Sequence, residues 1–101
     1  MIFKVPAQVG DVILLATDGV FDNLFQEEIA RVVSGELGRG GTPTSAAEQC
    51  AKLAHLRGAD SRTMSPFAQE ARTAGLLHRG GKLDDVCVVV GIITAQKEPQ
   101  L

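Results

Sequence analysis

The sequence predicts a mixed fold of helices and strands, and three features indicate it. Two short apolar runs rich in β-branched residues lie at residues 11–17 and 86–94, and such runs are typical of strands. Three segments between them carry apolar residues at helical spacing. Glycine-containing turns separate the segments. The predicted order is strand, three helices, strand, in a chain of 101 residues that forms one domain at most.

The two predicted strands are apolar along their whole length. The run at 11–17 (DVILLAT) ends at Asp18, and the run at 86–94 (VCVVVGIIT) follows Asp84 and Asp85. Continuous apolar runs are typical of strands buried on both faces. Two strands are too few for an independent sheet. We therefore expect their partners to come from sequence outside this chain or from another chain.

Capping patterns place the predicted helices. Asn23 has capping-box spacing to the glutamine that follows it, which predicts a helix over 24–37. Ser45 has the same spacing and predicts a second helix over 45–57, after a glycine-rich loop at 38–44.

A third, shorter helix is predicted over 66–74. Ser65 suits its N-cap, Pro66 its first position, and Gly75 the position after its C-cap.

The composition argues against several function classes. The net charge is −2, and the only aromatic residues are four phenylalanines, so the chain lacks a basic stripe and stacking platforms for nucleic acid. Its apolar runs are too short to span a membrane. Cys50 and Cys87 lie in apolar stretches, where we expect buried, reduced thiols. The sequence has neither a secretory signal nor a transit peptide, and any targeting segment would lie upstream.

Acidic residues follow the first predicted strand and precede the second. If the strands are neighbours, Asp18 and the Asp84-Asp85 pair lie together, and carboxylates suit Mg²⁺ or Mn²⁺. Two such ions can activate a shared water and clamp a phosphoryl group. On spacing alone, however, an Asp-Gly at a strand end is more often a turn, and an Asp-Asp pair before a strand is more often a solvated cap.

Two motifs resemble those of the type 2C (PPM) protein phosphatases. Residues 10–23 (GDVILLATDGVFDN) are similar to the family's strand and Asp-Gly-x-x-Asp motif, and residues 80–90 (GGKLDDVCVVV) to its final Asp-Asp/Asn motif and closing strand. Residues 64–85 resemble the organellar branch, whose animal members are mitochondrial. The similarity extends over about 10–93.

The resemblance implies an α+β fold, the C-terminal part of an αββα sandwich of antiparallel sheets flanked by helices. Residues 1–101 would form a partial phosphatase domain, with 96–101 as a polar tail.

The resemblance also implies site residues. Asp18 and Asp84 would be ligands of a binuclear Mg²⁺ or Mn²⁺ centre, Asp22 would help to hold a third, weaker ion, and Asp85 would orient its neighbours. No residue of this chain is assigned a catalytic role. The family's metal-bridging aspartate and phosphate-gripping basic residue have no counterpart here, so we expect activity to require the N-terminal half of the domain.

The implied function is a serine/threonine phosphatase. A metal-activated water would hydrolyse phosphoserine or phosphothreonine in a phosphoprotein substrate, in a mitochondrion or plastid, with neither nucleic acid nor a membrane as partner. The alternative is a non-catalytic type 2C-like module that binds a partner through its sheet.

Other chemistries fit less well. A cysteine-dependent phosphatase needs a Cys-x5-Arg loop, whereas Cys50 and Arg57 are seven positions apart. We expect His55 and His78 to be solvated or bonded locally. Lys82, next to the acidic pair, could contact substrate phosphate, but a loop lysine is more often a solvated charge, and it is left outside the site.

Overall fold

The fold is built on two antiparallel strands with helices on one side. A computed structural model describes residues 8–76, 78–82 and 84–95 of the chain. In chain order the elements are β1 (Val12–Ala16), α1 (Asp18–Phe21), α2 (Gln26–Gly38), α3 (Pro43–Ala59), α4 (Pro66–Thr73) and β2 (Val88–Ile92). The strands pair from Val12 opposite Ile92 to Ala16 opposite Val88. The predicted neighbouring strands and their order relative to the three helices are confirmed.

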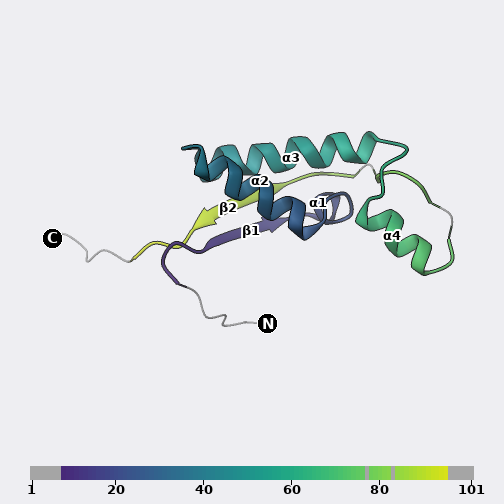
Figure 1. The fold of residues 1–101 in the computed structure, drawn as a ribbon, viewed down its shortest axis with the longest axis horizontal. Helices are drawn as coiled ribbons and strands as arrows, with labels where there is room; N and C mark the ends of the chain where they lie inside the picture. Colours follow the sequence, from purple (N-terminus) through teal and green to yellow (C-terminus); the bar gives the residue numbers. More distant parts are fainter. Residues whose placement is uncertain (1–7, 77, 83, 96–101) are drawn as a thin grey trace.

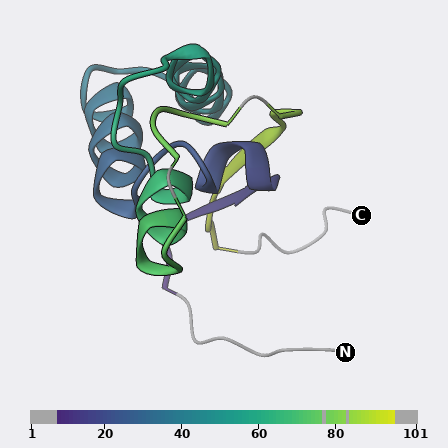
Figure 2. The ribbon, with the colours of Figure 1, turned by 90° about the vertical axis from the view of Figure 1, so that its right-hand side faces the viewer.

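The core lies between the sheet and the two long helices. Figures 1 and 2 show α2 and α3 on the same side of the strands. The buried cluster consists of Val20, Leu24, Ile29, Val33, Ala46, Cys50 and Ala54. Side chains of β1 and β2 that point toward the helices pack against this cluster.

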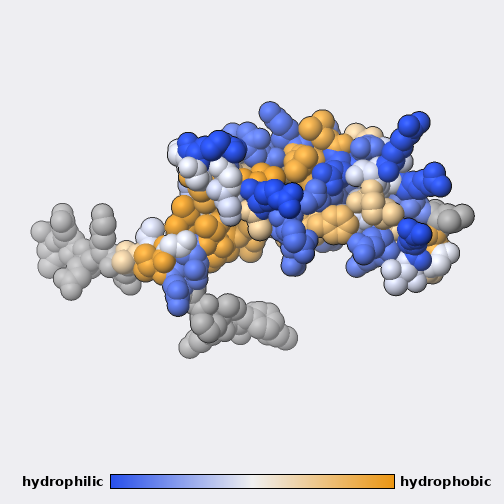
Figure 3. All heavy atoms as spheres, in the orientation of Figure 1, coloured by the Kyte–Doolittle hydropathy of each residue, from blue (hydrophilic) through white to orange (hydrophobic). Residues whose placement is uncertain are grey.

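The opposite face of the sheet is apolar and exposed. Ile13, Leu15 and Val89 are 44%, 66% and 59% exposed, and Figure 3 shows hydrophobic atoms gathered over the strands. Within the described residues helices cover only one face, so burial of the other face, which the apolar runs predict, would need the partners expected from outside this chain. The strands also begin later and end earlier than the predicted 11–17 and 86–94.

Of the two cysteines, which were both expected to be buried, only Cys50 is buried. Cys50 is buried as predicted, and burial raises the pKa of its thiol. Cys87, which was expected to be buried, is exposed. It lies two positions before Val89, on the uncovered face, since side chains alternate between faces along an extended chain.

The first long helix begins later than predicted. The expected helix over 24–37 starts at Gln26, because Asn23 is buried and bonded elsewhere instead of capping it. Glu28 caps this end by accepting a hydrogen bond from the Phe25 N–H at 3.1 Å.

The second long helix begins earlier than predicted. Thr42 and Ser45 cap each other: the Ser45 N–H donates to Thr42 Oγ1 (3.0 Å), and the Thr42 N–H donates to Ser45 Oγ (2.8 Å). Helix α3 therefore starts at Pro43, and the loop predicted at 38–44 is shorter, since Gly38 still belongs to α2.

The short helix α4 matches its prediction closely. Ser65 Oγ accepts a hydrogen bond from the Ala68 N–H at 3.0 Å, and Gly75 follows the helix with φ +81°, a conformation that favours glycine. Helix α1, a single turn directly after β1, was not predicted. None of the helices within the described residues has the length and apolar character that crossing a membrane requires. The polar tail predicted at 96–101 lies outside the described residues.

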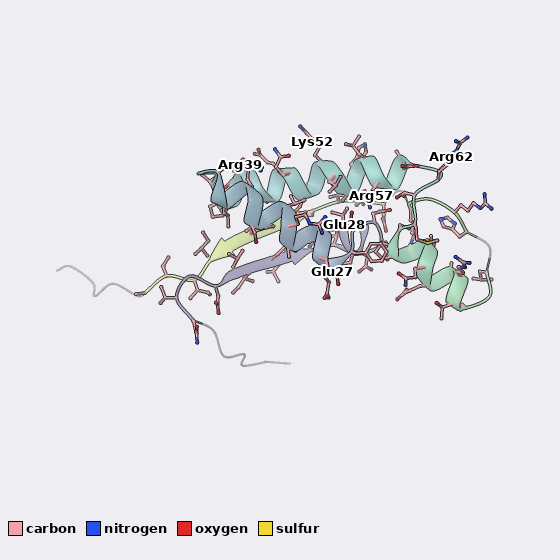
Figure 4. The ribbon with its side chains drawn as sticks, viewed as in Figure 1. Glu27, Glu28, Arg39, Lys52, Arg57 and Arg62 are labelled. Atoms are coloured by element: carbon pink, nitrogen blue, oxygen red, sulfur yellow. The ribbon has the colours of Figure 1, made fainter. Side chains whose placement is uncertain are left out.

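An ion pair joins the two long helices. Arg57 on α3 donates to both carboxylate oxygens of Glu28 on α2, at 3.1 and 2.7 Å, and the two side chains are 21% and 25% exposed. Figure 4 shows the pair between the helices. The hydrogen bond from Arg57 is the largest of the effects that lower the pKa of Glu28, and it outweighs the desolvation that raises it.

We predict that Arg57→Gln lowers the free energy of unfolding by about 1 kcal/mol at pH 7, as expected for a well-aligned, partly buried ion pair. Because the folded-state pKa of Glu28 is lowered, its stabilisation is present above the unfolded-state pKa and is lost as the pH falls through the folded-state value. Urea unfolding from pH 7 toward pH 3 should show the variant and the parent chain converging. Arg39→Gln, which removes an exposed pair with Glu36, is the control and should change stability by less than about 0.5 kcal/mol. A loss that is equal at both ends of the pH range would contradict this account.

Candidate metal centre

The end of β1 lies against the segment that precedes β2. Antiparallel pairing ends at Ala16 opposite Val88, so the chain leaving β1 meets the chain entering β2. The Thr17 hydroxyl donates to the Asp85 carbonyl oxygen (2.9 Å) and accepts from the Cys87 N–H (3.0 Å). The backbone beside Asp18 is thus fixed to the backbone beside Asp84.

Gly19 permits this close approach. It is buried, and a Cβ atom at this position would overlap the Asp85 carbonyl oxygen. Its φ is not positive, so the requirement for glycine comes from packing between two backbones rather than from turn conformation.

A buried amide holds the same two segments together. Asn23 is 1% exposed. Its Nδ2 donates to the carbonyl oxygens of Gly19 (2.8 Å) and Lys82 (2.7 Å), and its Oδ1 accepts from the Lys82 N–H (2.8 Å). Three hydrogen bonds therefore use both donors and the acceptor of this side chain, and the two with Lys82 bridge residues 59 positions apart.

The Lys82 ammonium group lies beside Asp22, the third predicted metal ligand. Lys82 Nζ is 3.8 Å from Asp22 Oδ2 and 4.9 Å from the centre of the Phe67 ring. The Phe67 N–H donates to the Asp22 carbonyl oxygen at 2.9 Å, which joins the start of α4 to the end of α1. The Lys82 side chain is 44% exposed, as expected for a solvated charge, and it lies beside Asp22.

The structure brings the predicted acidic segments to one end of the sheet. Asp18 is exposed in the first position of α1, and Asp84 is exposed just ahead of β2, where its Oδ1 accepts from the Asp85 N–H at 2.8 Å. In the described part of the chain, no group of three His, Cys, Asp or Glu side chains is arranged to hold a metal ion. The donors are carboxylate oxygens, which suit Mg²⁺ or Mn²⁺. They fit such an ion as part of a ligand set rather than a complete one.

Three residues that shape this end of the molecule were missed from the sequence. Thr17, Asn23 and Lys82 all lie inside the two motifs at 10–23 and 80–90. Their place within those motifs was the available signal. The spacing of Asn23 predicted that it caps a helix, because a capping pattern reflects only hydrogen-bond partners within a few residues.

We predict that Asn23→Ala lowers the free energy of unfolding by about 2 to 3 kcal/mol, since it leaves buried backbone groups without partners. Hydrogen exchange of the Lys82 amide should accelerate more than that of amides in α3. Asn23→Asp is the sharper test, because a carboxylate would face two carbonyl oxygens.

The aspartate variant should be as unstable as the alanine variant at pH 7 and should regain stability relative to it as the pH falls, when the protonated acid can donate again. Equal stability of the parent chain and both variants would show that this amide does not hold the segments together.

Comparison with known proteins gives a consistent result. No family model matches the chain. It is 45% identical over 94 residues to "Probable protein phosphatase 2C 80" of Arabidopsis thaliana, covering 93% of this chain and 23% of that protein. It is 42% identical over 91 residues to "Protein phosphatase PTC7 homolog" of Homo sapiens, covering 85% and 29%. The chain thus spans less than a third of the length of these relatives.

A solved structure shares the fold. The X-ray structure of the photosystem II phosphatase PBCP superposes with a TM-score of 0.78 at 32% identity, over 91% of this chain and 39% of that one. The predicted α+β fold, matching part of a type 2C phosphatase, is confirmed. With the relatives above, this match places the chain in the type 2C protein phosphatase family, of which it represents a fragment.

Proposed function

We propose that this chain is part of a metal-dependent phosphatase that hydrolyses phosphoserine and phosphothreonine in proteins. The observation that carries the proposal is the fixed contact between the backbone around Asp18 and the backbone around Asp84. Two exposed carboxylates at one end of a strand pair suit oxygen-binding cations. The named phosphatases among the relatives support the same chemistry.

In this proposal, Asp18 and Asp84 contribute ligands to a pair of Mg²⁺ or Mn²⁺ ions, and Asp22 contributes to a third. Ions bound there would supply an activated water and neutralise charge on the phosphoryl group. The chain's own part is to hold its carboxylates in place through Thr17 and Asn23. Since these carboxylates make up only part of a ligand set, the remainder would come from the N-terminal half of the domain.

The cellular location is also a proposal. The resemblance of residues 64–85 to the organellar branch supports a mitochondrion or plastid.

The exposed sheet face favours a second candidate function. Both strands are edge strands among the described elements, and their outer face is apolar. A non-catalytic module could bind a partner by covering this face or by extending the sheet. Such a module would not need metal-binding carboxylates, so the effect of removing them distinguishes the two functions.

We predict that the chain supports catalysis when it replaces the matching segment of the Arabidopsis relative. The chimera should release phosphate from a phosphothreonine peptide in the presence of Mn²⁺, and a chelator should abolish this activity. Asp18→Asn and Asp84→Asn should each lower kcat by about 100-fold, because each removes a charged metal ligand.

Asp11→Asn is the matched control, since this carboxylate lies at the other end of β1 and accepts a hydrogen bond from the Gln8 N–H. It should keep nearly full activity. If the chimera is active and the Asp18 and Asp84 variants match the control, the metal assignment is wrong. A folded but inactive chimera would favour the non-catalytic module.

A further inference from the structure

Two adjoining hollows lie beside α4 and the segments that flank it. They measure about 460 and 500 Å³ and share Met64, His78 and Arg79, so they form one groove. Volumes of this size suit a ligand or a short peptide segment. The groove is lined chiefly by Arg62, Met64, Arg72, Leu76, His78 and Arg79.

The groove is positively charged. Arg62, Arg72 and Arg79 line it, and within the described residues none of the three forms a salt bridge. Residues 57–82 carry five Lys or Arg against two Asp or Glu, although the whole chain has a net charge of −2. Figure 4 labels Arg62 at the α4 end of the molecule.

The groove also offers apolar contact. Met64 and Leu76 line it and are 50% and 64% exposed. Exposed arginines beside exposed apolar side chains suit an extended peptide that carries acidic residues, because guanidinium groups pair well with carboxylates. A purely electrostatic surface would not need the apolar lining.

A row of contacts connects the groove to the candidate metal centre. Asp22 lies 3.8 Å from the Lys82 ammonium, which lies 4.9 Å from the centre of the Phe67 ring. The Phe67 ring in turn packs edge-on against His78, at 4.8 Å between centroids, and His78 lines the groove. A peptide in the groove would therefore lie within a few residues' reach of a phosphorylated side chain at the carboxylates.

We infer that this groove binds an acidic segment of the phosphoprotein substrate, close in sequence to the phosphorylated residue. The inference rests on the proposed function for the identity of the partner. The binding itself depends on the arginines and not on metal, so it can be measured without catalysis.

The test uses the whole chain and a labelled phosphothreonine peptide with acidic flanks, followed by fluorescence anisotropy in the presence of a chelator. The parent chain should bind this peptide and should bind a version with neutral flanks about tenfold more weakly. Arg72→Gln combined with Arg79→Gln should weaken binding of the acidic peptide by about tenfold. Arg72→Lys combined with Arg79→Lys should recover part of the affinity because it restores the charge.

Arg39→Gln combined with Lys52→Gln is the matched control, since it removes two positive charges from α3 and the end of α2, away from the groove (Figure 4). It should leave the affinity nearly unchanged. Equal weakening by both double variants, or binding to vesicles of anionic lipid but not to the peptide, would overturn the inference. Failure of the parent chain to bind the peptide with acidic flanks would also overturn it.

The two proposals fail separately. If the chain does not bind the peptide but the chimera has Mn²⁺-dependent activity, the groove proposal is refuted and the phosphatase proposal stands. If the chain binds the peptide but the chimera is inactive, the phosphatase proposal is refuted and the proposal of an acidic-peptide site stands.

Discussion

The side-chain amide of Asn23 is the interaction on which the candidate site depends. It ties the turn after β1 to the backbone at Lys82, so it fixes two segments that the sequence places far apart. An amide that is almost fully buried is tolerated only when its hydrogen bonds are made, so its geometry leaves little freedom. Thr17 and Gly19 then determine how closely the backbones approach. The exposed carboxylates of the site are thus positioned by two buried residues, Asn23 and Gly19, and by the exposed Thr17, none of which needs to touch a metal.

One face of the strand pair is left exposed to solvent. Helices α2 and α3 bury one face of the strand pair, and a pair of strands packed on one side is a workable half of a layered fold. The outer face keeps side chains such as Leu15 and Val89 in water, where burial would be worth about 25 cal/mol per Å² of apolar area. The match to 39% of a larger solved phosphatase agrees with a chain that represents part of a layered domain.

The sequence predicted elements better than it predicted their partners. Ser65 and Gly75 placed the ends of α4 because both signals act within a few residues. Asn23 was misassigned because its spacing to Gln26 imitates a cap, whereas its true partner lies 59 positions away and no local pattern records it. The continuous apolar character of the strands predicted burial on both faces, and their small number predicted that this chain does not supply all of it; the described helices cover one face. The resemblance to family motifs predicted Asp18 and Asp84 as metal ligands, and the strand pairing explains how their segments come together.

The position of Lys82 distinguishes the three proposed aspartate ligands by how strongly each would bind a metal ion. Its ammonium stands 3.8 Å from Asp22, so a divalent ion approaching this carboxylate would meet a positive charge and would have to displace it. Asp18 and Asp84 have no salt-bridge partner among the described residues, and an ion bound there would face no such competition. Since an ammonium and a divalent ion repel each other, Asp22 should be the weakest of the three ligands. The resemblance assigns it to the weaker, third ion, and this electrostatic ordering supplies a physical reason for that assignment.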